Sequence, residues 1–182
     1  MNNHTHQGGF TLLEVLIAFI VLTIGLLGTV ALQAKAKQAS YDSVQRAAAL
    51  ALANDIVQRV RTNDSPSAAT DYDVNFGSTS TSTAASCFNA RCTAAQMAAF
   101  DISEWIKATQ ARERTGALSD AFVCIDPTDN ADGTVSLQII VSWQGRQKIS
   151  QSSANKAITC GTGDNRRMVV MNTDINLRDG TL

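Results

Sequence analysis

The chain has 182 residues and nearly balanced charge, with 15 Lys and Arg against 16 Asp and Glu. This length suits about one domain. Glu14 is the only charged residue before Lys35, so the remaining chain holds 15 residues of each sign. Such a balance gives no argument for nucleic acid or anionic lipid as the main partner.

The first predicted element is an apolar stretch that follows a short polar leader. In the sequence GGFTLLEVLIAFIVLTIGLLG, residues 8–28, Glu14 is the only charge. The 18 uncharged residues from Val15 to Leu32 just reach across a hydrocarbon layer roughly 30 Å thick when they form a helix. The leader contains no Lys or Arg to fix the orientation, and Lys35 and Lys37 mildly oppose a cytoplasmic N-terminus.

Residues 10–62 contain no proline and are predicted to form one continuous helix. The second half is rich in the good helix formers Ala, Gln and Arg. It carries an apolar stripe at helical spacing: Leu50, Ala53, Val57 and Val60. We expect the first half to lie in a membrane and the second half to pack against a globular head.

Residues 65–86 are predicted to be a loop, ending in the low-complexity run GSTSTSTAAS, which is either flexible or accessible to glycans. Thr93 and Gln96 resemble a capping box, so an amphipathic helix is predicted over residues 93–115 and ends at Gly116. Its acidic side chains are predicted to be solvated: Asp101, Glu104 and Glu113.

The remainder is predicted to form strands. Residues 121–126 and 135–143 flank the turn sequence PTDNADG, which indicates an antiparallel hairpin, and further strands are predicted at 147–150 and 168–177. Two arginines are predicted to form a solvated loop pair, with a partner-binding role as the alternative: Arg166 and Arg167. Two tryptophans are predicted to pack in the core, with a place in an interface as the alternative: Trp105 and Trp143. The order of long helix, loop, short helix and sheet predicts an α+β fold with the sheet packed on the long helix.

Four cysteines follow the apolar stretch: Cys87, Cys92, Cys124 and Cys160. An even number suits two disulfides in an oxidising compartment, for which three pairings exist. The short spacing favours Cys87 with Cys92, which leaves Cys124 with Cys160. Four buried free thiols and a four-cysteine zinc site are the alternatives, although the chain has no C-x2-C knuckle for zinc.

Residues suited to catalysis or metal binding are scarce. His4 and His6 both lie in the leader, so removal of the leader leaves no histidine for a catalytic triad or a metal site. Residues 126–133 partly imitate a calcium loop, but Thr128 and Ile139 stand where an EF-hand needs acidic side chains. We therefore expect a protein that is not an enzyme and has no metal site or cofactor.

Glu14 needs an explanation, because a charge inside a bilayer costs on the order of 2.5 to 3.5 kcal/mol. If the chain is cut after Gly9, the new amine of Phe10 is a cation one helical turn from Glu14. The two groups then pair within one chain or set the register between neighbouring subunits. The alternative is that Glu14 caps the helix or reaches toward the lipid headgroups.

The motif GFTLLEVLIA resembles the prepilin cleavage motif of type IV pilins and of the pseudopilins of type II secretion. The resemblance implies the type IV pilin fold. It implies that a prepilin peptidase removes residues 1–9, cutting between Gly9 and Phe10, and N-methylates Phe10. Glu14 is then implied to meet the methylated amine of Phe10 on an adjacent subunit.

The resemblance also divides the chain into a transmembrane and assembly helix, residues 10–33, and a periplasmic head, residues 34–182. LQAK at 32–35 and VSWQGR at 141–146 narrow the resemblance to minor pilins of the PilV type. The implied partners are the peptidase, other minor pilins, the major pilin, the inner-membrane assembly platform and a tip adhesin.

The implied location is the inner membrane and later a surface pilus. A type II secretion pseudopilin is the near alternative to this interpretation. A DNA-binding pilin is the second alternative, but it predicts a basic stripe that the charge balance does not favour. No nucleic-acid partner is therefore expected.

Overall fold

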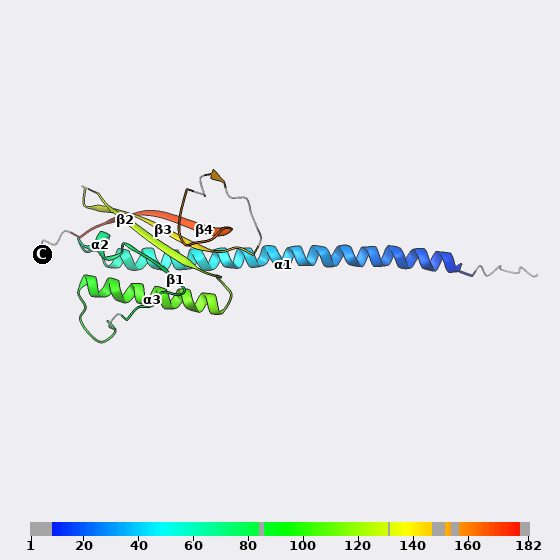
Figure 1. Ribbon diagram of the computed structural model, residues 1–182, viewed down its shortest axis with the longest axis horizontal. Coiled ribbons are helices and arrows are strands. Elements are labelled where there is room, and N and C mark those ends of the chain that lie inside the picture. The colour runs from blue at the N-terminus through cyan, green and yellow to red at the C-terminus, as the bar shows by residue number, and fades with distance from the viewer. Residues whose placement is uncertain (1–8, 84–85, 131, 147–151, 154–156, 179–182) are drawn as a thin grey trace, which may run out of the picture. The chain divides into compact units, whose positions relative to one another are not determined.

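We describe the chain from a computed structural model, which covers residues 9–83, 86–130, 132–146, 152–153 and 157–178 (Figure 1). It divides into two compact units, Met1–Ser43 and Val44–Leu182, called here the N-terminal unit and the head. The strand predicted at 147–150 lies outside the described residues.

Helix α1, Leu12–Thr62, has 51 residues, begins in the N-terminal unit and ends in the head. The prediction of one continuous helix over residues 10–62 is confirmed, with a start two residues later. The helix stops where the N–H of Asn63 bonds to the carbonyls of Arg59 and Val60. Pro66, four residues after Thr62, suits a chain that has left the helix.

The head contains a four-stranded antiparallel sheet in the order β1-β2-β3-β4 (Figure 1). The strands are β1, Val74–Gly77; β2, Phe122–Asp129; β3, Thr134–Gln144; and β4, Arg166–Asn176. The last three confirm the strands predicted in these regions. β2 continues through Pro127. Its pairing with β1 covers only residues 122–125, so at Pro127 that edge of β2 has no neighbouring strand among the described residues and needs no N–H donor.

The prediction of a loop over residues 65–86 is wrong in its first half. The structure forms a short helix there, α2, Ala68–Asp71, followed by β1. Each element has four residues, which is too short to leave a periodic apolar pattern in the sequence. β1 becomes a strand through its pairing with β2, where Phe76 lies opposite Val123 and is fully buried.

Helix α3, Ala94–Arg114, confirms the predicted second helix. Thr93 caps it, because its side chain accepts a hydrogen bond from the N–H of Gln96 at 3.2 Å. The side chain of Gln96 accepts in return from the N–H of Thr93 at 2.9 Å, which completes the predicted capping box. Gly116 follows with a positive φ of 72°, a conformation that favours glycine.

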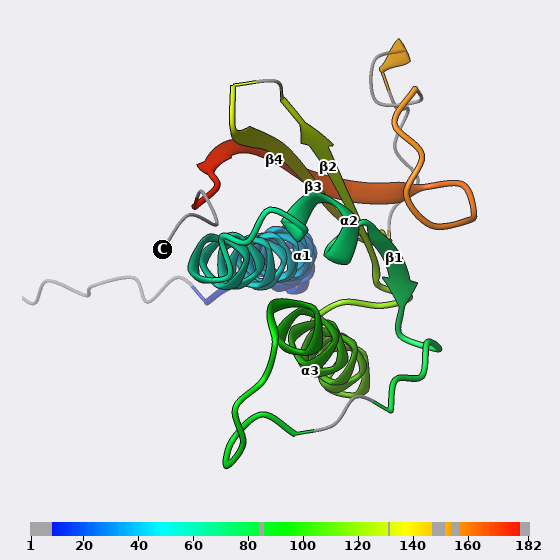
Figure 2. The ribbon, with the colours of Figure 1, turned by 90° about the vertical axis from the view of Figure 1, so that its left-hand side faces the viewer.

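The core of the head lies between the sheet and the helices. Figure 2 shows α1 along one face of the sheet, with α3 beside it. Alternate residues of β3 point into this core: Val135, Leu137, Ile139, Val141 and Trp143. The helices contribute others: Leu52, Ile56 and Val60 from α1 and Trp105 from α3. The predicted burial of both tryptophans is confirmed.

Candidate functional site

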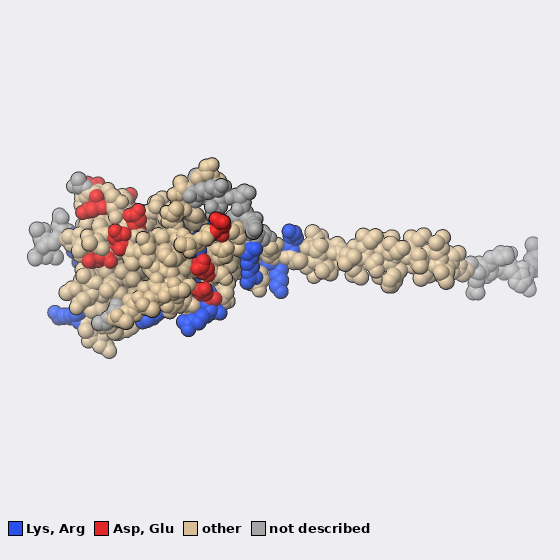
Figure 3. All heavy atoms as spheres, in the orientation of Figure 1, with Lys and Arg blue, Asp and Glu red and all other residues tan. Residues whose placement is uncertain are grey.

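The N-terminal unit exposes its apolar side chains instead of burying them. Phe10 is 84% exposed, and the large apolar residues from Leu12 to Leu32 are exposed along the helix. An 18-residue window of α1 near the N-terminus has a mean hydropathy of 2.7 and no buried residue. Figure 3 shows a long uncharged surface on the visible side of this segment. By length and composition this helix can cross a membrane, and so large an apolar surface needs lipid or other chains to cover it.

The start of α1 holds the residues singled out by the sequence. Thr11 immediately precedes the helix, and its hydroxyl accepts a hydrogen bond from the N–H of Glu14 at 3.3 Å. Glu14 lies in the first turn, where a negative charge is favoured by the helix dipole. Its side chain is exposed, and no hydrogen bond or ion pair joins its carboxylate to another described residue. The first turn therefore positions a carboxylate that lacks a partner among the described residues of its own chain.

In the head, the prediction that Asp101 is solvated is wrong. Asp101 is 4% exposed and accepts hydrogen bonds from the guanidinium of Arg59 at 3.0 Å and from the hydroxyl of Tyr72 at 2.9 Å. Burial raises the pKa of Tyr72, and the nearby charge of Asp101 raises it further. The hydroxyl of Tyr72 also accepts from the side-chain amide of Asn63, which acts in the opposite direction on the pKa of Tyr72.

The same polar cluster joins the two long helices. Asp55 of α1 accepts a hydrogen bond from the indole N–H of Trp105 at 2.9 Å and forms an ion pair with Arg59 at 3.2 Å. Although burial lowers the pKa of Arg59, the hydrogen bond to Asp101 and the charges of Asp55 and Asp101 raise it overall. The cluster pairs its charges internally, so its role is to fix α1 against α3. Sequence spacing does not reveal the bonds between the two helices, because the residues that these bonds join, Arg59 with Asp101 and Asp55 with Trp105, lie 42 and 50 positions apart.

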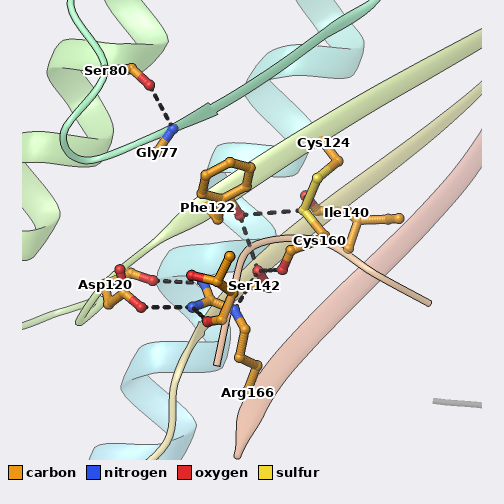
Figure 4. Close-up of a disulfide and its surroundings, with 10 residues drawn as sticks. Gly77, Ser80, Asp120, Phe122, Cys124, Ile140, Ser142, Cys160 and Arg166 are labelled. Carbon is orange, nitrogen blue, oxygen red and sulfur yellow. Dashed lines mark hydrogen bonds and ion pairs between the residues drawn. A yellow bond between two sulfur atoms is a disulfide. The ribbon is translucent and has the colours of Figure 1, made fainter. Parts of the chain in front are cut away.

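The solvated loop pair predicted at Arg166 and Arg167 is also wrong. Arg166 opens β4 and is 5% exposed (Figure 4). Its guanidinium donates to the carboxylate and the carbonyl of Asp120, both at 2.7 Å, and to the carbonyl of Thr162 at 3.0 Å. Its Nε donates to the hydroxyl of Ser142 at 3.1 Å. The buried arginine is tolerated because these bonds satisfy it.

The structure contains two disulfides, Cys87–Cys92 and Cys124–Cys160, which is the pairing favoured from the sequence. Cys124 and Cys160 form a second, smaller core with Ile140 on the sheet face opposite α1 (Figure 4). The hydroxyl of Ser142 donates to the carbonyl of Cys160 and accepts from Arg166. The segment around residue 160 is therefore held to the sheet both by the disulfide and by these hydrogen bonds.

The polar turn between β2 and β3 is confirmed as a hairpin. Hydrogen bonds from the side chain and backbone of Thr134 lower the pKa of Asp132. These bonds and the positive φ of Gly133, 79°, shape the turn. Within the described residues no group of three or more His, Cys, Asp or Glu side chains is placed to hold a metal ion.

Two family models match the chain. One, described as the prokaryotic N-terminal methylation motif, covers residues 4–30. The other, described as type IV pilin Tt1218, covers residues 31–103. These matches support a type IV pilin family. No curated protein and no solved structure matches the chain.

The pilin matches agree with the fold and with the first turn of α1. A long N-terminal helix with a four-stranded antiparallel sheet fits the α+β fold of type IV pilins. The methylation motif implies processing by a prepilin peptidase and use of the pilus assembly machinery. An exposed apolar helix behind that motif is consistent with anchoring of the chain in the inner membrane before pilus assembly.

Proposed function

We propose that this chain is a minor type IV pilin of the PilV type, without catalytic activity. In this proposal the peptidase removes residues 1–9, cuts between Gly9 and Phe10 and N-methylates Phe10. The observation that carries the proposal is the carboxylate of Glu14 in the first turn of an exposed apolar helix, with no partner among the described residues. The matched methylation motif supports it.

The mechanism is docking of one subunit on the next. Cleavage creates a cationic amine at Phe10, and Glu14 of a neighbouring subunit offers it a carboxylate in the same apolar layer. Because an unpaired charge is unfavourable there, the pair forms at one register and aligns the incoming helix. Residues 10–33 then exchange lipid for neighbouring helices, which are equally apolar, so packing rather than the hydrophobic effect drives this association.

In this proposal residues 34–182 lie in the periplasm, and the head docks on the heads of other subunits. Two disulfides suit that oxidising compartment. The resemblance of 32–35 and 141–146 to minor pilins supports a role in starting the fibre with other minor pilins, the major pilin, the assembly platform and a tip adhesin. Both signs of charge appear on the face of the head in Figure 3, which gives no support to a DNA receptor.

Mass spectrometry of sheared surface fibres and of the membrane fraction tests the proposal. We expect a peptide beginning at N-methyl-Phe10 in the fibres. Glu14→Gln, which removes only the charge, should leave processing intact but lower the amount in fibres at least about tenfold, the loss expected for one desolvated ion pair. Glu113→Gln, at an exposed carboxylate of the head, is the matched control and should change neither quantity.

Three results would contradict the proposal in different ways. A leader that remains uncut in both the fibre and the membrane fractions would rule out a type IV pilin. A processed peptide found only in membranes favours a type II secretion pseudopilin, or a subunit that initiates the fibre without being retained in it. Normal fibre content of Glu14→Gln keeps the family but excludes the pairing of Glu14 with Phe10.

A further inference from the structure

An irregular segment, residues 157–165, lies against the outer face of the sheet, which is the face opposite α1, and is called here the strap. Among the described residues, one backbone hydrogen bond ties it to the rest of the head, from the N–H of Gly145 to the carbonyl of Asn165 at 3.1 Å. Two of its side chains, Ile158 and Cys160, pack on apolar side chains of the outer face. The position of the strap therefore depends mainly on side chains.

Arg166, which directly follows the strap, holds two of its carbonyl groups. The guanidinium donates to the carbonyl of Thr162 at 3.0 Å. Its Nε donates to the hydroxyl of Ser142 at 3.1 Å, and this hydroxyl donates in turn to the carbonyl of Cys160. Gly161 lies between the two carbonyls with a φ of 81°, and a Cβ there would lie 2.7 Å from the guanidinium carbon. The backbone thus wraps closely around the guanidinium, and Cys160 is fixed from both sides.

The register of the sheet places Ser142 near Cys124. Ser142 of β3 lies opposite Phe122 of β2, and Cys124 follows Phe122 by two residues, so all three side chains lie on the outer face (Figure 4). The hydrogen bonds of Arg166 and Ser142 involve no cysteine side chain. They need the paired strands and not the disulfide, so they can form while Cys160 is still a thiol.

Chain entropy alone does not select the partner of Cys124. Cys92 and Cys160 lie at similar separations from Cys124 along the sequence, and the cost of closing a loop changes slowly with its length. A thiol that is held beside Cys124 has a much higher effective concentration there than one on a free chain. Fixing the strap would therefore favour Cys160 over Cys92.

We propose that Arg166 and Ser142 hold the strap in place before the disulfide forms, so that Cys160 rather than Cys92 becomes the partner of Cys124. The covalent step is exchange with a small disulfide such as oxidised glutathione. One cysteine thiolate attacks it and releases one glutathione, and the second thiolate attacks the mixed disulfide and releases the other. The two cysteines lose two protons and two electrons, and the reagent becomes two thiols. Arg166 takes no part in the exchange and acts as a positioning residue.

The first test asks whether the strap stays in place without its disulfide. In the full-length protein in detergent, replacing the other three cysteines with Ala leaves Cys160 as the one thiol. Its side chain is 4% exposed when the strap is in place, so a maleimide should label it at least about a hundredfold more slowly than in urea.

Variants of the arginine then identify what protects this thiol. Arg166→Met has a similar length but no donors, and it should speed the labelling of Cys160 at least about tenfold, since it loses several hydrogen bonds from a charged group. Arg166→Lys keeps the charge without the planar fork and should give an intermediate rate. Arg114→Met makes the same change at an exposed site on α3 and should leave the rate unchanged.

The second test measures the choice of partner. In a full-length chain with Cys87→Ala, Cys92 and Cys160 compete directly for Cys124 during refolding from urea with oxidised glutathione. Mass mapping of the disulfide peptides should show mainly the bond between Cys124 and Cys160. Arg166→Met should lower the ratio of this bond to the bond between Cys92 and Cys124 at least about tenfold.

Either of two results would overturn the proposal: labelling of Cys160 in the three-alanine protein as fast as in urea, or a labelling rate and pairing ratio that Arg166→Met leaves unchanged. Tryptophan fluorescence shows that the head of each variant is folded, since both tryptophans lie in its core. If Arg166→Met does not fold, Ser142→Ala takes its place. It removes only the hydroxyl that bonds to Cys160 and should speed the labelling at least about threefold.

Discussion

The two units of this protein use apolar residues in opposite ways. In the head, side chains such as Phe76, Leu118 and Ile139 are fully buried against one another. In the N-terminal unit, residues of the same kinds are exposed along the helix. The head therefore carries most of its stabilising contacts within its own chain, whereas the N-terminal unit needs lipid or other chains to cover its apolar surface.

Charged groups follow the same division. Arg59 with Asp101 and Arg166 with Asp120 join elements that are distant in the sequence, and each pair places at least one of its charges in the interior of the head. Glu14 has no such partner among the described residues. In the proposed function, this unpaired charge in an apolar setting serves assembly, whereas the paired charges of the head serve stability.

The largest expected difference in stability is between two variants, each of which replaces one aromatic side chain with alanine, one in the head and one in the N-terminal unit. Trp105→Ala removes a residue that is 1% exposed, packs on Tyr72 and bonds to Asp55. It should lower the free energy of unfolding by about 4 to 5 kcal/mol. Phe19→Ala, at a residue 66% exposed in the apolar helix, should change the free energy of unfolding of the head by less than about 0.5 kcal/mol.

Urea titrations of the full-length protein in detergent, followed by the remaining head tryptophan fluorescence, measure both changes. The fluorescence reports on the head alone because neither tryptophan lies in the N-terminal unit. A loss of head stability in Phe19→Ala as large as that in Trp105→Ala would refute the division into a self-sufficient head and a dependent helix.

A smaller effect separates the two disulfides within the head. The bond between Cys124 and Cys160 spans 36 positions, and the bond between Cys87 and Cys92 spans five. Loop-closure entropy then predicts losses of about 4 and about 2 kcal/mol when each pair is replaced by Ala. Chemical denaturation of the two double variants measures the difference. Equal losses would mean that the short disulfide stabilises the head by more than its loop-closure entropy.

Sequence reasoning predicted the elements whose pattern is long and local. The helix over residues 10–62 has no proline and a clear change of composition, and α3 has Thr93 and Gln96 at the spacing of a capping box. The strands of the hairpin have strong apolar character around a polar turn. In each case, the residues that determine the element lie within the element itself.

The features that sequence reasoning missed depend on contacts between distant residues. β1 has four residues and exists because β2 pairs with it. Asp101 and Arg166 were expected in solvent because Asp and Arg usually are. Asp101 bonds to Tyr72, 29 positions away, and Arg166 bonds to Asp120, 46 positions away, and no local pattern reveals such partners. The candidate site at Glu14 was visible because its motif is local.

The smallest of the three effects concerns Tyr72, whose hydroxyl donates to buried Asp101. Tyr72→Phe should lower the free energy of unfolding by about 1.5 kcal/mol at neutral pH, because it removes a hydrogen bond to a charged acceptor. Burial raises the pKa of Tyr72 above its ordinary value of 10.0, so the folded state holds this proton more tightly than the unfolded state. The resulting stability is complete below about pH 10 and is lost as the pH rises through the folded pKa.

The deficit of Tyr72→Phe should therefore shrink as the pH is raised from neutral to about 11, since only the wild-type protein must keep a buried phenol protonated. Thermal unfolding of both proteins across this range measures the change. Tyr41→Phe, at a residue 46% exposed in the N-terminal unit, is the matched control and should give no such dependence. A deficit that is constant with pH would mean that Tyr72 titrates alike in both states. The polar cluster would then be open to solvent, and the contrast between a closed head and an open N-terminal helix would be weaker than the structure implies.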